Sequence, residues 1–315
     1  DRQSKKLMAE IKRLPVPPSL DGERVDTALS KMLGISRSLI AEYAERGLVL
    51  HGGKVVGKSD RVIADSLVEV QLPVVESPLQ VVALEVPELK IVYQDHDLVV
   101  IDKPAGVAAH PSVGWDGPTV LGVLLARGIS VTTSGAQERQ GIVQRLDVGT
   151  SGLMMVAKTE LAYSRLKQMF RDRVVHKVYH AIVQGHPDPF EGTIDAPIDR
   201  HPKDDYKMAV IVDGKPSVTH YEVIEYYRSV SLLKVELETG RTHQIRVHFS
   251  AFKHPLIGDS MYGADPTLAA RLGIERQWLH AVKLSFEHPT TGEMVEFESQ
   301  YSADLAEVLG RLRDN

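Results

Sequence analysis

The chain has 315 residues, of which 43% are hydrophobic and 25% are charged, enough apolar material for the cores of two domains. It contains no cysteine, which excludes disulfides, thiolate zinc sites and a cysteine nucleophile, and fits an intracellular protein. The formal net charge of −5 counts against a nucleic-acid binder on first reading, yet residues 171–180 and 241–254 form locally basic strips that remain compatible with a phosphate-rich partner.

The N-terminal quarter predicts a flexible arm followed by a small domain. Residues 1–18 are polar and proline-rich, and we expect a loosely ordered arm there. Apolar residues at helical spacing predict a helix from Val25 to Leu33, and Ser36 can cap a second helix that ends near Gly47. A hairpin over 48–56 and a strand over 68–72 complete a unit spanning 19–73.

The segment from Gly52 to Ser59 matches the phosphate-binding loop pattern G-x-x-x-x-G-K-[ST]. A phosphate loop must run from a strand directly into a helix, whose N-terminus holds the phosphates. The residues after Ser59 instead alternate in the manner of a strand, and Gly52-Gly53 is typical of a hairpin turn. A nucleotide hydrolase is therefore the minor alternative, which micromolar binding of a nucleoside triphosphate would support.

The remainder predicts a linker over 74–87 and a large domain over 88–315. Many short strands and few helices favour an α+β fold with a mostly antiparallel mixed sheet. The expected strands are IVYQ, LVVI, LMMVA, VYHAIV, HYEVIEYY, SLLKVEL and MVEFE. The expected helices span residues 120–126, 161–170, 243–252 and 304–312. Residues 127–140 are polar and predict a mobile loop.

The stretch GIVQRLDVGTSG places Arg145 and Asp147 in a tight loop between two apolar strands. An adjacent arginine lowers the pKa of a carboxylate, and flanking strands would hold it rigidly, as a catalytic group requires. From the residues alone, a plain Arg–Asp pair that ties the turn is the simpler explanation.

The stretch LETGRTHQIRVHF predicts a helix capped by Thr242, with Arg241 at its entrance and free to reach an anion. His243 and His248 are five residues apart, a poor helical pair for one metal ion, and no clear acidic ligand lies nearby. We therefore predict no metal site here.

Together these motifs resemble those of the RluA/RluD-type pseudouridine synthases. QRLDVGTSG is similar to the family signature HRLDxxTSG, and the resemblance continues through IDKPAGVAAHPS, HKVYHAIVQG, LETGRTHQIRVHF, HPLIGDSMYG and WLHAVKLSFEHP. It covers nearly all of residues 88–300 in the family's order. The N-terminal unit resembles an S4-like RNA-binding domain.

The resemblance implies conversion of uridine in RNA, most simply large-subunit ribosomal RNA, to pseudouridine without a cofactor or metal. Asp147 corresponds to the catalytic carboxylate, and Arg241 to the basic residue that pairs with it. Arg145 corresponds to the arginine that fills the space of the flipped nucleotide, Tyr179 to the tyrosine that stacks on the base, and Ile245 to an apolar wall. The implied protein is a cytoplasmic monomer that does not bind membranes.

Three routes for Asp147 stay open: attack on the anomeric carbon, attack on carbon 6 of the base, and abstraction of the ribose 2′ proton. The sequence also departs from the family at Gln144, where histidine is usual, and glutamine cannot titrate. An RNA-binding assembly factor without activity is therefore a second hypothesis.

The N-terminal unit offers a candidate phosphate site at the start of its second helix. Ser36, Arg37 and Ser38 lie there, and Lys54 and Lys58 are further candidate RNA contacts. Over residues 20–72, however, Lys and Arg do not outnumber Asp and Glu, so RNA binding depends on their clustering on one face.

Overall fold

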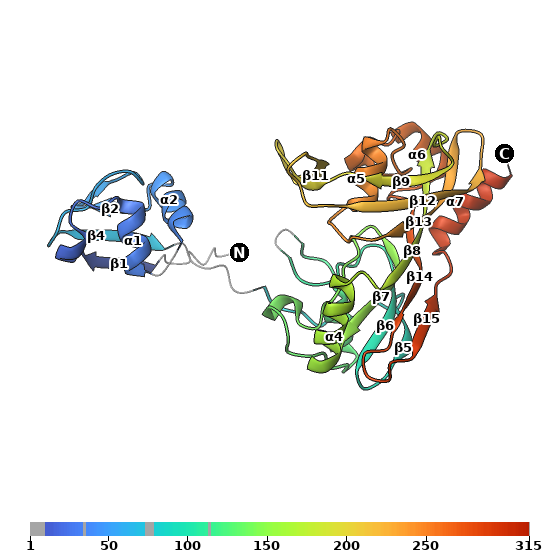
Figure 1. Cartoon of the computed structure of the whole chain (residues 1–315), viewed down its shortest axis with the longest axis horizontal. Coiled ribbons are helices and arrows are strands. Elements are labelled where there is room, and N and C mark those ends of the chain that lie inside the picture. The colour runs from blue at the N-terminus through green and yellow to red at the C-terminus, as the bar shows by residue number, and fades with distance from the viewer. Residues whose placement is uncertain (1–9, 34–35, 73–78, 113–114, 315) are drawn as a thin grey trace, which may run out of the picture. The chain divides into compact units, whose positions relative to one another are not determined.

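The computed structural model describes residues 10–33, 36–72, 79–112 and 115–314, shown in Figure 1. The chain separates into two compact units, residues 1–78 and residues 79–315. Each unit has its own hydrophobic core. Among the described residues, no helix has both the length and the apolar character that a bilayer crossing requires.

The first unit is a four-stranded antiparallel sheet packed against two helices. The helices are α1 (Val25–Leu33) and α2 (Arg37–Glu45), and a 3-10 turn, η1 (Pro18–Leu20), precedes them. The sheet order is β1 (Glu10–Pro15), β4 (Leu67–Leu72), β2 (Val49–His51) and β3 (Lys54–Val55). Apolar residues of both helices and of β2 and β4 form one core, so the predicted helix–helix–sheet unit is confirmed.

The glycine-rich segment is the turn of a β-hairpin. Gly52 and Gly53 have φ values of 57° and 78°, and they join β2 to β3. From Lys58 to the start of β4 the described chain forms turns and an isolated bridge but no helix. The Lys58 ammonium lies 2.7 Å from a Glu45 carboxylate oxygen. The hairpin prediction is confirmed, and the phosphate-loop alternative is wrong because no helix N-terminus follows the loop.

The expected N-terminal arm is wrong for residues 10–18, while residues 1–9 lie outside the described residues. Strand β1 pairs with β4 along its whole length, from Glu10 opposite Leu72 to Pro15 opposite Leu67. Val16, directly after it, is almost completely buried. Proline and charge hid this strand in the sequence because an edge strand tolerates both.

The second unit is built on a nine-stranded mixed sheet. Its order is β5 (Lys90–Gln94), β6 (Leu98–Lys103), β7 (Ser151–Ala157), β14 (Leu279–Glu287), β8 (His176–Gln184), β13 (Val230–Leu237), β12 (Val218–Tyr226) and β9 (Glu191–Asp195) (Figure 1). Strand β15 (Met294–Glu298) pairs with β14, and β10 (Ile198–His201) and β11 (Asp204–Val210) form a separate hairpin. Among the described pairings between named strands of this sheet only β7 with β14 is parallel, so the mostly antiparallel prediction is confirmed.

The helices of this unit pack against three hydrophobic clusters around the sheet. They are α3 (Val120–Ala126), α4 (Glu160–Arg171), α5 (Gln244–Ala251), α6 (Pro266–Leu272) and α7 (Ala303–Arg313). Two 3-10 turns are η2 (Gln137–Arg139) and η3 (Ser260–Tyr262). The four predicted helices are confirmed, whereas α6 and strands β9, β10, β11 and β14 were not predicted.

Strand β7 begins with Ser151 and Gly152, the last two residues of the QRLDVGTSG motif, and lies in the middle of the sheet. All seven of its residues are buried, consistent with a strand covered on both faces. Gly152 has a φ of 114°, and a Cβ atom there would lie 2.3 Å from the carbonyl oxygen of Ala281 on β14. This glycine therefore allows the close parallel pairing that fixes the loop before β7.

The predicted linker over 74–87 is wrong for its second half, and residues 73–78 lie outside the described residues. Val81 and Val86 pack against the core of the second unit. The Leu84 amide donates to the carbonyl of Gly122 at 3.3 Å, and the Arg127 guanidinium donates to Glu85 at 2.9 Å. The segment from Leu79 onward is thus part of the second unit.

Candidate active site

Asp147 lies in the loop that enters β7, and several hydrogen bonds fix this loop. The Thr150 amide donates to the Asp147 carbonyl at 3.0 Å, and the Gly106 amide donates to the Val148 carbonyl at 2.8 Å. The Arg276 guanidinium donates to the Gly149 carbonyl at 2.9 Å and also pairs with Asp304 of α7. The backbone of the loop that carries the Asp147 carboxylate is therefore anchored at three successive residues.

The cation that pairs with Asp147 is Arg246, which the sequence analysis did not identify. Its Nη1 lies 3.1 Å from Asp147 Oδ2, and the two side chains are 8% and 24% exposed. Arg246 also donates twice to Asp259, at 2.7 and 3.0 Å, and its guanidinium lies 4.9 Å from the Tyr262 ring centroid. Burial disfavours its charge, but Asp259 and Asp147 outweigh this and raise the pKa of Arg246.

The expected pairing of Arg241 with Asp147 is wrong. Arg241 is exposed, and its Nε donates to the carbonyl of Pro216 at 3.2 Å. It precedes α5, whereas Arg246 lies inside α5 between buried neighbours and points toward Asp147. Arg246 lies in a buried stretch of α5, and a buried guanidinium needs carboxylate partners, which explains why this arginine pairs with Asp147.

The expected cap of α5 is also wrong. The N-cap position is His243, in the left-handed region at a φ of 55°, and its side chain makes no capping bond. The Thr242 hydroxyl instead accepts from Arg145 at 3.2 Å. The Gln244 carboxamide oxygen accepts from the Arg241 amide at 3.0 Å, which ties the start of α5 to the loop before it. A strained residue at this helix start is consistent with a functional loop.

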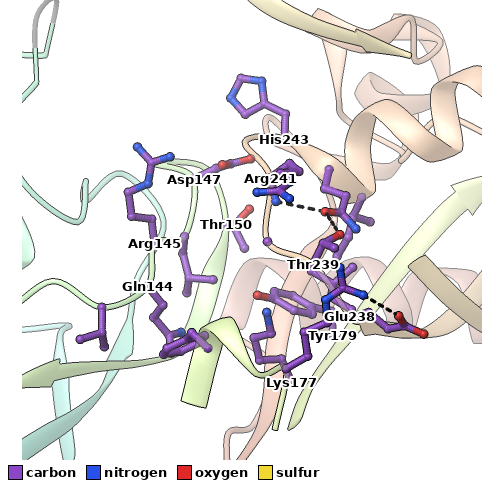
Figure 2. A pocket seen from close by; sticks show the side chains of 18 of the residues that line it. Gln144, Arg145, Asp147, Thr150, Lys177, Tyr179, Glu238, Thr239, Arg241 and His243 are labelled. Carbon is purple, nitrogen blue, oxygen red and sulfur yellow. Dashed lines mark hydrogen bonds and ion pairs between the residues drawn. The ribbon is translucent and has the colours of Figure 1, made fainter. Parts of the chain in front are cut away.

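A cavity of about 520 Å³ opens beside Asp147 (Figure 2). Arg145, Asp147, Tyr179, Arg241 and Ile245 all line it, so the structure brings the five predicted site residues together. A second cavity of about 860 Å³ shares Gln144, Arg145, Asp147, Arg241 and His243 with the first. The two form one groove with Asp147 in its wall.

The walls of this groove differ in polarity. Tyr179 and Ile245 are buried, at 7% and 4% exposure. Burial, together with the nearby Asp147, raises the pKa of Tyr179, which keeps its hydroxyl neutral. Arg145 is exposed, and since Asp147 pairs with Arg246, the simple Arg145–Asp147 turn pair is not formed. The Gln144 carboxamide oxygen is buried without a hydrogen-bond partner among the described residues.

Lys103 is a buried ammonium beneath the Asp147 loop. It is fully buried, and its Nζ donates to the carbonyls of Val107, Pro104 and Val148 at 2.7, 3.0 and 3.3 Å. Burial lowers the pKa of Lys103 to about 7, although Asp147 opposes the shift. Lys103 therefore ties the loop that follows β6 to the residue next to Asp147.

The depressed pKa of Lys103 predicts a pH dependence of stability. Between pH 7 and pH 10 the unfolded chain binds the proton and the folded chain does not, so the free energy of unfolding rises with pH. The rise approaches about 1.4 kcal/mol per pH unit at most. Urea titrations at several pH values should show this component in the wild type and not in Lys103→Met. The exposed Lys215→Met is the control, and an unchanged pH dependence in Lys103→Met would contradict the assignment.

The candidate RNA contacts of the first unit are mostly engaged within that unit. Ser36 caps α2 by accepting from the Leu39 amide at 3.3 Å, which confirms the predicted cap. Arg37 lies 3.2 Å from the buried Asp26, and Lys58 pairs with Glu45. Ser38 and Lys54 are exposed. Pairing within the unit reduces the charge available to a phosphate.

Two histidine-containing groups bear on metal binding. Both ring nitrogens of His248 are hydrogen-bonded, to Thr219 and to the Ala196 carbonyl, so His243 and His248 do not share an ion site. Among the described residues, Asp95, Asp97 and His288 lie close enough to hold a metal ion. His288 Nε2 lies 2.6 Å from Asp95, and threonines hydrogen-bond Asp97, so these groups already form a structural network.

Comparisons with known proteins agree with the site. Residues 97–251 match the family described as RNA pseudouridylate synthase. An uncharacterised RNA pseudouridine synthase of Mycobacterium bovis is 56% identical, over 95% of this chain and 97% of that protein. The ribosomal large subunit pseudouridine synthase D of Xanthomonas campestris is 39% identical, over 100% of this chain and 96% of that protein.

A solved structure supports the same assignment. Human RNA pseudouridylate synthase domain containing 4 aligns with a TM-score of 0.56 and 28% identity, over 71% of this chain and 92% of that chain. The sequence relatives span nearly the whole length of the present chain. The chain therefore belongs to the RluA/RluD-type family of RNA pseudouridine synthases, isomerases that convert uridine within RNA to pseudouridine.

Proposed function

We propose that this protein converts specific uridines of large-subunit ribosomal RNA to pseudouridine, with Asp147 as the catalytic carboxylate. The observation that carries the proposal is the Asp147–Arg246 pair in the wall of a cavity that Tyr179 and Ile245 also line. The names of relatives similar over nearly the whole chain favour ribosomal RNA as the substrate.

The geometry suits a carboxylate that must act on a ribose or a base. Arg246 donates to the Asp147 carboxylate at 3.1 Å, and two further hydrogen bonds to Asp259 fix its guanidinium. One edge of the carboxylate remains open to the cavity, since Asp147 is 24% exposed. Each of the three routes requires an ionised, immobilised carboxylate against the target nucleotide. The geometry serves all three.

Base flipping explains the remaining residues. A stacked uridine must leave its stack to enter the cavity, at a cost of roughly a few kcal/mol. Arg145 is exposed at the cavity and anchored to Thr242, a position suited to filling the vacated space. Tyr179 offers an aromatic wall for the base, and Ile245 an apolar one. Closure of such a pocket would keep the detached uracil from water.

The first unit is proposed to be an S4-like module that helps to bind the RNA. Its exposed Ser38 and Lys54, with Ser36, Arg37 and Lys58, are the candidate contacts. Because Arg37 and Lys58 are paired with carboxylates, we expect this module to add affinity only alongside the second unit. The protein is proposed to act as a monomer in the cytoplasm.

Mapping of pseudouridines in ribosomal RNA tests the function directly. Large-subunit RNA from cells that lack this protein should lose one or a few pseudouridines, and expression of the wild-type chain should restore them. Gln144→His should modify the same positions. An assembly factor without activity would instead bind the RNA and leave the modification pattern unchanged, which would overturn the proposal.

A further inference from the structure

Lys177 shares the active-site cavity with Tyr179. The two lie two residues apart on β8, so their side chains project to the same face of the sheet. Both line the cavity of about 520 Å³, and Figure 2 shows them side by side, with Asp147 across the cavity. His176 and Val178, which alternate with them, line a groove on the opposite face.

No described residue accepts a hydrogen bond from the Lys177 ammonium or forms an ion pair with it. Its Nζ lies 5.6 Å from the Phe170 ring centroid, and a Cβ atom on Gly240 would lie 3.6 Å from it. Burial alone lowers the pKa of Lys177 to about 8. Lys177 is partly buried, and an ammonium that is shielded from water without an anion is costly, so such groups concentrate at functional sites.

Both carboxylates that line this cavity are paired with cations other than Lys177. Glu238, which lines the same cavity, lies 3.3 Å from Arg173 and 2.7 Å from His220, and Asp147 pairs with Arg246. The other cations on the cavity are exposed, namely Lys167 and Arg171 of α4, Arg173 of the following turn, and Arg145 and Arg241 of the loops. Burial also lowers the pKa of His243. The exposed cations suit the RNA backbone outside, whereas Lys177 faces inward.

We propose that the Lys177 ammonium donates a hydrogen bond to a carbonyl oxygen of the flipped uracil and stabilises the negative charge that the base acquires during the reaction. The inference rests on the proposed function, since it requires Asp147 to act on a uridine in this cavity. Tyr179 would hold the base by its face, and Lys177 would bind its polar edge.

The charge balance of the reaction supports this role. When the bond between the ribose C1′ and N1 breaks, its electron pair passes to the base and spreads over N1, O2 and O4. Attack at carbon 6 likewise sends an electron pair to O4. Lys177 keeps its proton in this step and changes only the energy of the anion. A preorganised donor in a site shielded from water changes such rates by about 10²–10³.

Single-turnover kinetics test the inference. Enzyme in excess is mixed with unmodified large-subunit ribosomal RNA tritiated at carbon 5 of uridine, and the tritium released when C5 bonds to C1′ is counted. Lys177→Met should lower the saturating rate by about 10²–10³ and leave the Kd for RNA nearly unchanged. Lys234→Met, a lysine paired with Glu236 on the opposite face of the sheet, is the matched control and should keep the wild-type rate.

The pH profile separates this role from a structural one. The wild-type rate should fall as the pH rises through about 8, because the ammonium loses its proton. Lys177→Arg keeps a cation to higher pH, so its decline should move upward, and Lys177→Met should lack that decline. Should Lys177→Met fail to fold in thermal denaturation, an arginine variant with the wild-type profile overturns the inference.

Two further outcomes would each overturn the inference, for different reasons. A Lys177→Met variant with a normal saturating rate but weaker, salt-dependent RNA binding would identify a phosphate contact and overturn the proposal. A wild-type protein that releases no tritium from this RNA would instead contradict the proposed function, and the inference would fall with it.

Discussion

Asp147→Asn should reduce the single-turnover rate of tritium release by at least about three orders of magnitude, because the amide can neither attack nor accept a proton as a carboxylate does. RNA affinity should remain close to that of the wild type, because the Asp147 side chain is a small part of the groove. Thermal stability should change little, since Arg246 keeps both of its bonds to Asp259.

The matched comparison is Glu238→Gln, which changes the other carboxylate on the same cavity. That carboxylate pairs with Arg173 and His220 at the exposed end of β13, so its loss should leave most of the rate. Full turnover by Asp147→Asn, or equal losses in the two variants, would contradict the assignment of Asp147. Binding of each variant to the same RNA should be measured by filter retention.

Arg246→Met should both destabilise the fold and abolish activity. It leaves Asp259, which is 2% exposed, as an uncompensated buried carboxylate. Loss of one partner of a buried pair typically costs about 3–5 kcal/mol, a fall in the unfolding free energy that urea titration would detect. Activity should fall with it, because Asp147 loses its only cation among the described ion pairs. Arg246→Lys should recover little, since an ammonium cannot bind Asp259 through two parallel hydrogen bonds.

A double variant separates the two effects of Arg246. Arg246→Met combined with Asp259→Asn removes the uncompensated charge, so it should regain part of the lost stability. It should not regain activity, because Asp147 remains unpaired. Recovery of both would show that Arg246 supports the fold without a direct effect on the reaction, and an unchanged stability of Arg246→Met alone would contradict the buried-pair interpretation.

Local sequence signals predicted the helices whose starts are set by a neighbouring capping residue. Helix α3 follows Thr119, whose hydroxyl caps it, and α2 follows Ser36 in the same way. Helix α6 has only seven residues and a narrow apolar stripe, so its Asp265 cap, Pro266 and Gly273 were the only signals. The β10–β11 hairpin is polar and lacks clear alternation, and its pairing gives no pattern that sequence reading detects.

The candidate site was predicted through the motifs that resemble the family, since residue type alone favoured a plain Arg–Asp turn pair. Asp147 and Tyr179 stand in specific motifs, and the structure places both on one cavity. The identity of the pairing cation was not predictable, because Arg241 and Arg246 lie in the same motif and only the structure shows which of them faces Asp147. Lys103 and Lys177 were missed for a related reason: burial gives them their importance, and a sequence does not show the depth of a lysine.

The two hydrogen bonds from Arg246 to Asp259 have a consequence for the proposed reaction. In every route proposed for Asp147, its carboxylate would end the first step as an ester, an adduct or an acid and would no longer be an anion. A guanidinium paired with Asp147 alone would then be buried without a counterion, and its surroundings would have to reorganise to stabilise its charge. Asp259 remains as a permanent counterion, so the enzyme can cycle between the two electrostatic states without moving the arginine.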